Sequence, residues 1–196
     1  MTPAPDQLLS PLAARRGHFR LESGHHGSLW LDLEQLCLRP ERVRPFAVEL
    51  ARKLAFHGVE AVCGPLNEGA FVALMVAEAL GADFTYAERI AATDRDGLFP
   101  VDYRIPGPLR ERVRGRRVAI VNDVINAGSA VRGTFADLQA CGAIPVALAS
   151  LVVLGDFAAQ LAASWGIPLE TLRQQSNPLW EASVCPLCAA GEPMCQ

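Results

Sequence analysis

Residues 118–130 read VAIVNDVINAGSA, and this stretch decides the fold. An apolar run typical of a buried parallel strand ends in the polar pair Asn122-Asp123, and small residues then lead into a helical pattern. At such a junction several backbone N–H groups meet the positive end of the helix dipole, which suits a phosphate group. Gly128 permits a close approach and Ser129 adds a hydroxyl donor. Because a carboxylate repels phosphate, Asp123 is expected to accept hydrogen bonds from sugar hydroxyls, and the stretch predicts a sugar-phosphate site.

The segments on both sides alternate between apolar runs and helical periodicity, which is typical of an α/β fold with a mainly parallel, twisted sheet flanked by helices. Residues 88–108 are rich in charge, glycine and proline, and we expect a mobile loop of about 20 residues there. A short helix over residues 6–16 is predicted to precede two short strands at 19–21 and 29–33. Further strands are predicted at residues 61–63, 84–87, 117–121, 144–154 and 169–172, and helices at residues 40–57, 70–80, 130–141 and 157–165.

Composition excludes several classes of function. The 196 residues are 51% hydrophobic and carry a net charge of −3, so the chain can bury a sizeable core but lacks the excess positive charge of a nucleic-acid-binding protein. No apolar run approaches the roughly 18 residues that span a bilayer, and the N-terminus does not follow a secretory pattern, so we expect a cytoplasmic protein with no membrane partner. Lys53 is the single lysine, which excludes a Walker A loop and disfavours Schiff-base chemistry. The glycine fingerprint of dinucleotide-binding sites is also missing.

The 118–130 stretch resembles the phosphoribosyl diphosphate (PRPP) signature of type I phosphoribosyltransferases, in which an apolar strand precedes two acidic residues, two apolar residues and a small-residue loop. Three further segments are similar to orotate phosphoribosyltransferases, in the same order along the chain. FRLESG at 19–24 resembles part of that family's hood over the base, VCGPLNEG at 62–69 its pyrophosphate loop, and YAER at 86–89 the strand leading into its catalytic loop. The resemblance covers about residues 19–155.

The resemblance implies that phosphoribose is transferred from PRPP to a nitrogenous base with release of pyrophosphate. Orotate is the leading candidate for the base, which would place the reaction in pyrimidine nucleotide synthesis, and Mg²⁺ would bind with the diphosphate. A homodimer is implied as well, because in that family the mobile loop reaches into the neighbour's site. One domain would then span residues 1–173, with a hood at about 1–36, and an irregular cysteine-containing tail would follow at 174–196.

The resemblance also assigns roles to residues. The expected catalytic residues are Asp123 and the loop arginines Arg89 and Arg95, which would close over the leaving group. Glu68 suits a pyrophosphate site if it helps to bind Mg²⁺. The expected substrate-binding residues are Asn122, Asn126, Ala127, Gly128, Ser129 and Ala130 at the ribose phosphate, Gly64, Pro65, Leu66, Asn67, Glu68 and Gly69 at the pyrophosphate, and Ser23 and Gly24 in the hood.

The chain departs from the family pattern at several positions. The loop from 88 has no lysine, and the segment Leu154-Gly155-Asp156 stands where an arginine for a substrate carboxylate is expected. These departures keep open an alternative function, a catalytically impaired sensor that binds PRPP or a nucleotide. The single-residue departures are Asn122 for the first acidic residue, Asn126 for the usual threonine and Glu22 for the usual lysine.

The six cysteines form two groups. Cys37, Cys63 and Cys141 fall in or beside apolar segments and are predicted to be reduced core residues. Cys185 and Cys188 form a CPLC knuckle, the kind of spacing that binds zinc. A closed zinc site would need further ligands, from Cys195, from another element or from another subunit. A disulfide and uncommitted thiols are the alternatives, and a disulfide is disfavoured in the cytosol.

Overall fold

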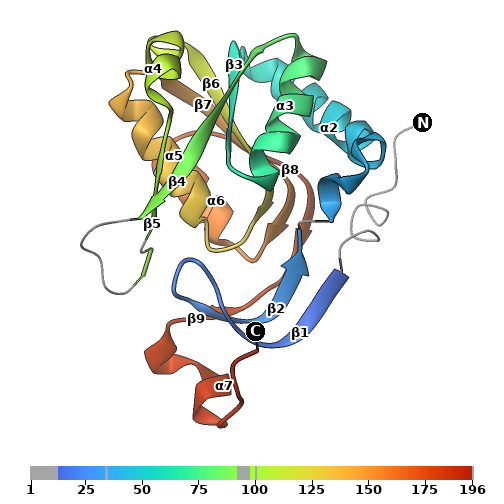
Figure 1. Ribbon diagram of the computed structural model, residues 1–196, viewed down its shortest axis with the longest axis vertical. Helices are drawn as coiled ribbons and strands as arrows, with labels where there is room; N and C mark the ends of the chain where they lie inside the picture. The colour runs from blue at the N-terminus through green and yellow to red at the C-terminus, as the bar shows by residue number, and fades with distance from the viewer. Residues whose placement is uncertain (1–12, 34, 92–97, 100, 196) are drawn as a thin grey trace.

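The computed structural model describes residues 13–33, 35–91, 98–99 and 101–195, and these residues form two β-sheets (Figure 1). The larger sheet has six strands in the order β5-β4-β3-β6-β7-β8, and the smaller has three in the order β1-β2-β9. In the larger sheet β4, β3, β6, β7 and β8 are parallel neighbours, and β5 is antiparallel to β4. Its strands are β3 (Ala61–Pro65), β4 (Asp83–Ala91), β5 (Val101–Arg104), β6 (Arg117–Ile125), β7 (Ile144–Leu154) and β8 (Leu169–Gln175).

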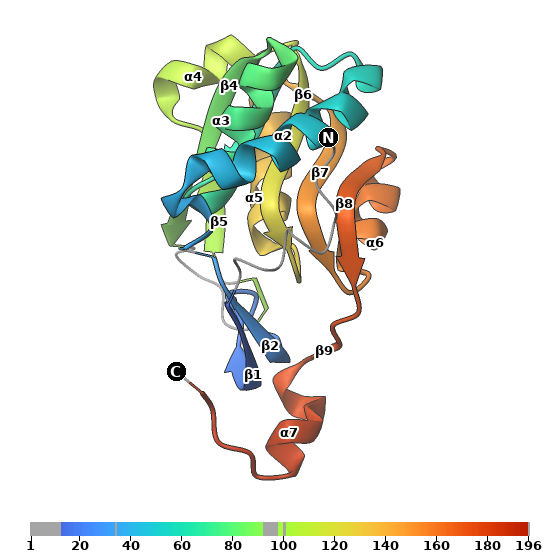
Figure 2. The same ribbon diagram turned by 90° about the vertical axis from the view of Figure 1, so that its right-hand side faces the viewer.

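Helices cover both faces of this sheet, so the mixed α/β fold with a mostly parallel sheet is confirmed (Figure 2). α2 (Pro40–Leu54) and α3 (Glu68–Leu80) pack on one face, and α4 (Gly107–Val113), α5 (Ser129–Ala140) and α6 (Phe157–Trp165) lie against the other. The alternation along β6 explains both layers, because Ala119 and Val121 enter the core under α2 and α3 while Val118 and Ile120 enter the opposite core. Among the described residues, no helix has the length and apolar character needed to cross a bilayer.

The smaller sheet, which we call the hood sheet, joins the two ends of the described chain. β1 (Ala13–Arg20) pairs antiparallel with β2 (His26–Asp32), and β9 (Leu179–Trp180) adds to the free edge of β2. In both views the hood sheet lies beyond one end of the six-stranded sheet, and the C-terminal segment with α7 (Pro186–Ala189) lies beyond the hood (Figures 1 and 2). Short 3-10 turns complete the secondary structure at η1 (Leu36–Leu38), η2 (Ala55–His57) and η3 (Ala182–Val184).

Of the elements predicted near the N-terminus, the two strands are confirmed and the helix is wrong where the structure describes it. The short strands around the turn at residues 21–25 are present, although both are longer than predicted. The helix predicted over residues 6–16 is wrong from residue 13 onward, because Ala13 pairs with Asp32 and Arg16 with Leu29 in an antiparallel ladder. Local periodicity could not show this pairing, since its partners lie in another strand. The rest of that predicted helix lies outside the described residues.

The loop predicted over residues 88–108 is shorter than expected. β4 continues to Ala91, β5 pairs with it from Ala91↔Val101 to Glu88↔Arg104, and α4 begins at Gly107. Val101 and Tyr103 alternate into the core, a period-two signal that the neighbouring charges hide in the sequence. Residues 92–97 and 100, in the middle of the predicted loop, lie outside the described residues.

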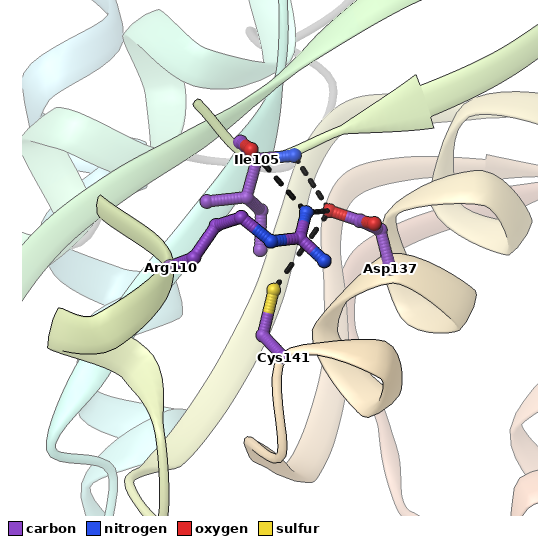
Figure 3. Close-up of polar contacts among 4 residues, drawn as sticks. All are labelled: Ile105, Arg110, Asp137 and Cys141. Carbon is purple, nitrogen blue, oxygen red and sulfur yellow. Dashed lines mark hydrogen bonds and ion pairs between the residues drawn. The ribbon is translucent and has the colours of Figure 1, made fainter. Parts of the chain in front are cut away.

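A carboxylate on α5 anchors the far end of this hairpin (Figure 3). Asp137 Oδ2 accepts hydrogen bonds from the Ile105 backbone N–H at 2.7 Å and from Arg110 Nη1 at 2.7 Å. The nearby Cys141 thiol lies 3.9 Å from the same oxygen, and burial together with Asp137 raises its pKa. One side chain therefore ties the end of β5 and the start of α4 to the helix that follows β6.

Candidate active site

A cleft of about 260 Å³ separates the hood sheet from the carboxyl ends of the central strands. Ligands of open α/β sheets bind at this edge, where the loops after successive parallel strands meet. The cleft is lined by residues 21–23, 29–31 and 33 of the hood and the segment after it, 65–69 after β3, 122–131 at the end of β6 and the start of α5, with Tyr103 and Leu154. The cleft therefore brings together most of the residues singled out from the sequence.

The turn from β6 into α5 forms one wall of the cleft. The sequence predicts that the strand ends at residue 121, before Asn122 and Asp123. In the structure β6 runs to Ile125, so both residues lie within the strand. Gly128 occupies the position before the helix with a φ of 83°, a conformation that favours glycine. α5 begins at Ser129, and the first N–H groups of a helix have no partner within the helix. The predicted residues from Asn122 to Ala130 all line the cleft, and this wall can hold an anion on backbone amides.

Asp123 is the buried acid of the cleft. Its side chain is almost fully buried, and its Oδ2 atom has no hydrogen-bond partner in the part of the chain that the structure describes. Burial, with a smaller contribution from the nearby Glu68 carboxylate, raises the pKa of this carboxyl from 3.8 to about 7. The Ser150 hydroxyl donates to the Asp123 carbonyl oxygen at 2.9 Å and holds the backbone in place. An unsatisfied carboxylate oxygen on a residue that lines a cleft is suited to a hydroxyl donor or to a cation.

The turn after β3 forms the neighbouring wall. Pro65 to Gly69 line the cleft, and the Leu66–Asn67 peptide bond is cis. Gly64 does not line it, because this residue faces α3, where a Cβ would lie 2.6 Å from the Ala73 Cβ. A Cβ on Gly69 would collide with the Asn122 side-chain oxygen, so glycine is needed for β6 and α3 to approach each other.

The hood contributes Ser23 to the cleft and Gly24 to the turn behind it. Gly24 has a φ of 83°, and its N–H donates to the Leu21 carbonyl at 2.9 Å, so its part is to close the turn. Beside it, Glu22 accepts a hydrogen bond from the Tyr103 hydroxyl at 3.2 Å and pairs with Arg89 Nε at 2.9 Å. Burial and the Glu22 carboxylate raise the pKa of Tyr103.

The structure places the two predicted catalytic arginines differently. Arg89 lies on β4, and its guanidinium is committed to Glu22 at the rim of the cleft instead of lining it. Arg95 lies outside the described residues. Among the described residues, no lysine or arginine lines the cleft. Three acidic residues line it: Glu22, Glu68 and Asp123.

Tyr103 in the cleft and Asn177 beside it are among the residues that the sequence analysis did not assign to the site. Tyr103 lines the cleft from β5, and the alternation of apolar residues at 101, 103 and 105 is the signal of that strand which the neighbouring charges obscure. Asn177 is buried after β8, and its amide donates to Asn126 Oδ1 at 3.1 Å. This contact joins segments 51 residues apart, and no local pattern predicts it.

The CPLC cysteines do not line the cleft. Cys185 and Cys188 lie on the far side of the hood sheet, close to His18 of β1 and His26 of β2. Cys195 is not part of this group. All six cysteines are free, and Cys63 and Cys141 are buried as predicted, whereas Cys37 is only partly buried.

Comparison with solved structures identifies the fold class of the protein. The adenine phosphoribosyltransferase of Rhodothermus marinus matches with a TM-score of 0.65 over 87% of this chain and 98% of that one, at 19% identity. The orotate phosphoribosyltransferase of Aeropyrum pernix matches with a TM-score of 0.63 over 83% of this chain and 88% of that one, at 24% identity. The fold is that of the type I phosphoribosyltransferases.

Curated relatives define the family within this class. The orotate phosphoribosyltransferase of Thermotoga maritima is 31% identical over 183 residues, 92% of this chain and 89% of that protein. That of Caldanaerobacter subterraneus is 27% identical over 91% of this chain and 87% of that protein. No family model matches the chain. The chain belongs to the orotate phosphoribosyltransferase family and is a glycosyltransferase of the phosphoribosyltransferase class.

Proposed function

We propose that the protein transfers phosphoribose from PRPP to orotate and releases pyrophosphate. The observation that carries this proposal is the cleft in which the α5 N-terminus, the buried Asp123 carboxylate and the 65–69 turn face one another under the hood. The relatives named orotate phosphoribosyltransferase support the choice of base. They do not support the alternative of a catalytically impaired sensor, because their names are those of an enzyme.

In this proposal each wall binds one part of PRPP. The amides from Asn126 to Ala130 hold the 5-phosphate, since the positive end of the α5 dipole lies there. Asp123 accepts hydrogen bonds from the ribose hydroxyls through its unpartnered Oδ2. The 65–69 turn receives the diphosphate. Catalysis then consists mainly of positioning the base nitrogen and C1 in line and of stabilising the charge on the leaving group.

The cleft residues fit Mg²⁺, the cofactor that PRPP would bring. Asp123 and Glu68 place two carboxylates in a cleft with no basic lining residue in the described chain, and oxygen donors are the ligands that Mg²⁺ prefers. We infer that Glu68, with Asp123, holds the ion beside the diphosphate. When bound, Mg²⁺ neutralises charge on the leaving group.

Arg89 supplies the protein's own positive charge in this proposal. Its side chain is 58% exposed, and an exposed pair such as Arg89–Glu22 contributes no more than about 1 kcal/mol, so the arginine can exchange Glu22 for the diphosphate. Arg95 is assigned the same role. We also expect a homodimer in which loop residues from one subunit reach the neighbour's cleft; the exposed side chains of Phe71 and Leu74 on α3 are suited to an interface.

The test is pyrophosphate release from PRPP and Mg²⁺ with orotate, and in parallel with uracil, adenine and hypoxanthine. Turnover with orotate alone is the expected result. Turnover with a different base would overturn the choice of substrate, and PRPP binding by calorimetry without turnover on any base would favour the sensor. Light scattering on the eluting protein checks the dimer.

A further inference from the structure

Four metal-ligand side chains from three segments converge behind the hood, away from the cleft. His18 lies on β1 and His26 on β2, whereas Cys185 immediately precedes α7 and Cys188 lies within it. Their ligand atoms all lie within 4.8 Å of one another. Three of the four side chains are buried, and Cys188 is exposed. The histidines are 8 residues apart and the cysteines lie roughly 160 residues further along the chain, so only the folded chain assembles the group.

Four of the six spacings among these atoms lie within about 0.3 Å of those expected around one tetrahedral ion. With Zn–N bonds of about 2.0–2.1 Å and Zn–S bonds of about 2.3 Å, tetrahedral ligands lie about 3.3 Å apart for two nitrogens and about 3.5 Å apart for nitrogen and sulfur. His18 Nε2 lies 3.0 Å from His26 Nδ1. Cys185 Sγ and Cys188 Sγ each lie 3.6 Å from His18 Nε2, and Cys188 Sγ lies 3.3 Å from His26 Nδ1.

These distances separate a single ion from other arrangements. Hydrogen bonds alone cannot satisfy all the contacts, because the acceptor nitrogen of a neutral imidazole has one lone pair. His26 Nδ1, Cys185 Sγ and Cys188 Sγ all lie within 3.6 Å of His18 Nε2. A two-iron cluster binds its histidines on one iron and its cysteines on the other, which would separate sulfur from nitrogen by more than the observed 3.3–3.6 Å. Two thiolates and two imidazoles around one point are a typical donor set for structural zinc.

A hydrogen bond to a backbone carbonyl orients the first histidine. His18 Nδ1 lies 2.8 Å from the Glu192 carbonyl oxygen, so Nδ1 carries the proton and donates it. Nε2 of the neutral ring is then left unprotonated, and this is the atom that faces the other three ligands. Metal-binding histidines commonly hold their second nitrogen in this way.

The C-terminal segment, residues 178–195, has little packing of its own to hold it against the hood sheet. Among residues 178–195, Cys185 is the single buried residue, so this segment has no apolar core of its own. α7 has four residues, too few for a stable isolated helix. Other contacts of the C-terminal segment with β1 and β2 include the two-residue β2–β9 pairing. The Cys195 N–H also donates a hydrogen bond to the His18 carbonyl oxygen at 2.7 Å. Small units of this kind fold around metals or disulfides.

We propose that His18, His26, Cys185 and Cys188 bind one structural Zn²⁺ that fastens the C-terminal segment to the hood. Both cysteines bind as thiolates, so each releases its proton on binding. Four protein ligands leave no open position, and the ion takes no part in chemistry. Because Ser23 and Trp30 on the same hairpin line the cleft, the ion also fixes the hood over the candidate active site.

Metal content of the purified full-length protein, expressed with added zinc and without chelators, tests the proposal independently of any transferase activity. About one zinc per chain is expected, and the Cys185→Ser and Cys188→Ser variants should lose it. Removal of one ligand weakens zinc binding by more than the roughly 10–100-fold that follows from losing a residue which only orients a ligand. Cys195→Ser is the matched control, because its sulfur faces Gly17 and lies outside the group.

Substitution of Co²⁺ for Zn²⁺ in the wild-type protein provides a second test that does not depend on whether the cysteine variants fold. Co²⁺ in the wild-type protein should give the intense visible bands of a tetrahedral site with thiolate ligands. Chelation should accelerate hydrogen exchange in residues 179–195 and in β1 and β2. A metal-free protein with free thiols or a Cys185–Cys188 disulfide would overturn the proposal. So would zinc retained in both cysteine variants, or iron in place of zinc.

Discussion

Replacing Asp123 by asparagine should stabilise the free protein at neutral and alkaline pH. Burial raises the pKa of this carboxyl from 3.8 to about 7. Between these values the folded chain holds a proton that the unfolded chain has already lost, so stability falls as pH rises through this window and stays low above it. Asparagine has a similar shape and carries no charge, and it removes this cost of burying a carboxylate.

The size of the effect follows from the two pKa values. The rise from 3.8 to about 7 corresponds, at about 1.4 kcal/mol per tenfold change in proton affinity, to about 4 kcal/mol. This figure is a ceiling, because asparagine keeps one of the two acceptor oxygens and buries an amide in place of the other. A gain of at least about 1 kcal/mol at pH 8 is expected, which raises Tm by about 2–4 °C in a chain of this length.

The assay is thermal and urea unfolding of the wild type and Asp123→Asn from pH 5 to 8.5, without PRPP or Mg²⁺. The gain should grow with pH up to about 7 and then level off. Asp156→Asn is the matched control, because it removes the same charge from an exposed position. Equal stability of wild type and Asp123→Asn at pH 8, or a difference that does not vary with pH, would refute the reasoning.

Three further variants test contacts in the cleft, beside it and at the Asp137 anchor of β5. Gly69→Ala should lower stability by about 1–3 kcal/mol because its Cβ collides with Asn122 Oδ1, and most of that loss should disappear in the Asn122→Ala background; an additive double mutant would contradict the clash. Asp137→Ala should cost about 1–3 kcal/mol in urea unfolding, because it leaves the Ile105 N–H unpaired, and Arg110→Ala should cost less; the reverse order would count against this anchor. Asn177→Ala should cost about 1 kcal/mol and raise the KM for PRPP by freeing Asn126, and an unchanged KM would show that the contact does not position the site.

Local sequence pattern was sufficient for the central elements and for one wall of the cleft. The apolar run at 118–121, the small-residue turn and the helical periodicity after it are local properties, and β6, Gly128 and α5 follow from them. The same holds for α2, which ends near Gly58 in the left-handed conformation. Each of these depends on hydrophobic periodicity and backbone freedom within a few residues.

Pairing between distant segments could not be predicted in this way. The strand from Ala13 depends on β2, and β5 depends on its register with β4, since isolated edge strands are fixed by their partners. Asn177 reaches Asn126 because β8 lies beside β7 in the folded sheet. Burial also set the state of Asp123, whose raised pKa comes mainly from desolvation that no local pattern shows.

By itself, the sequence determined the parallel α/β core, the strand–turn–helix wall with Asp123 and Gly128, and the metal-binding spacing of Cys185 and Cys188. The tertiary structure alone decided that His18 and His26 join those cysteines and that Glu22 takes Arg89. The physical reason is range: backbone propensity and hydrophobic periodicity act over a few residues. Coordination geometry, ion pairing and desolvation depend on which distant residues the fold brings within a few ångströms of each other.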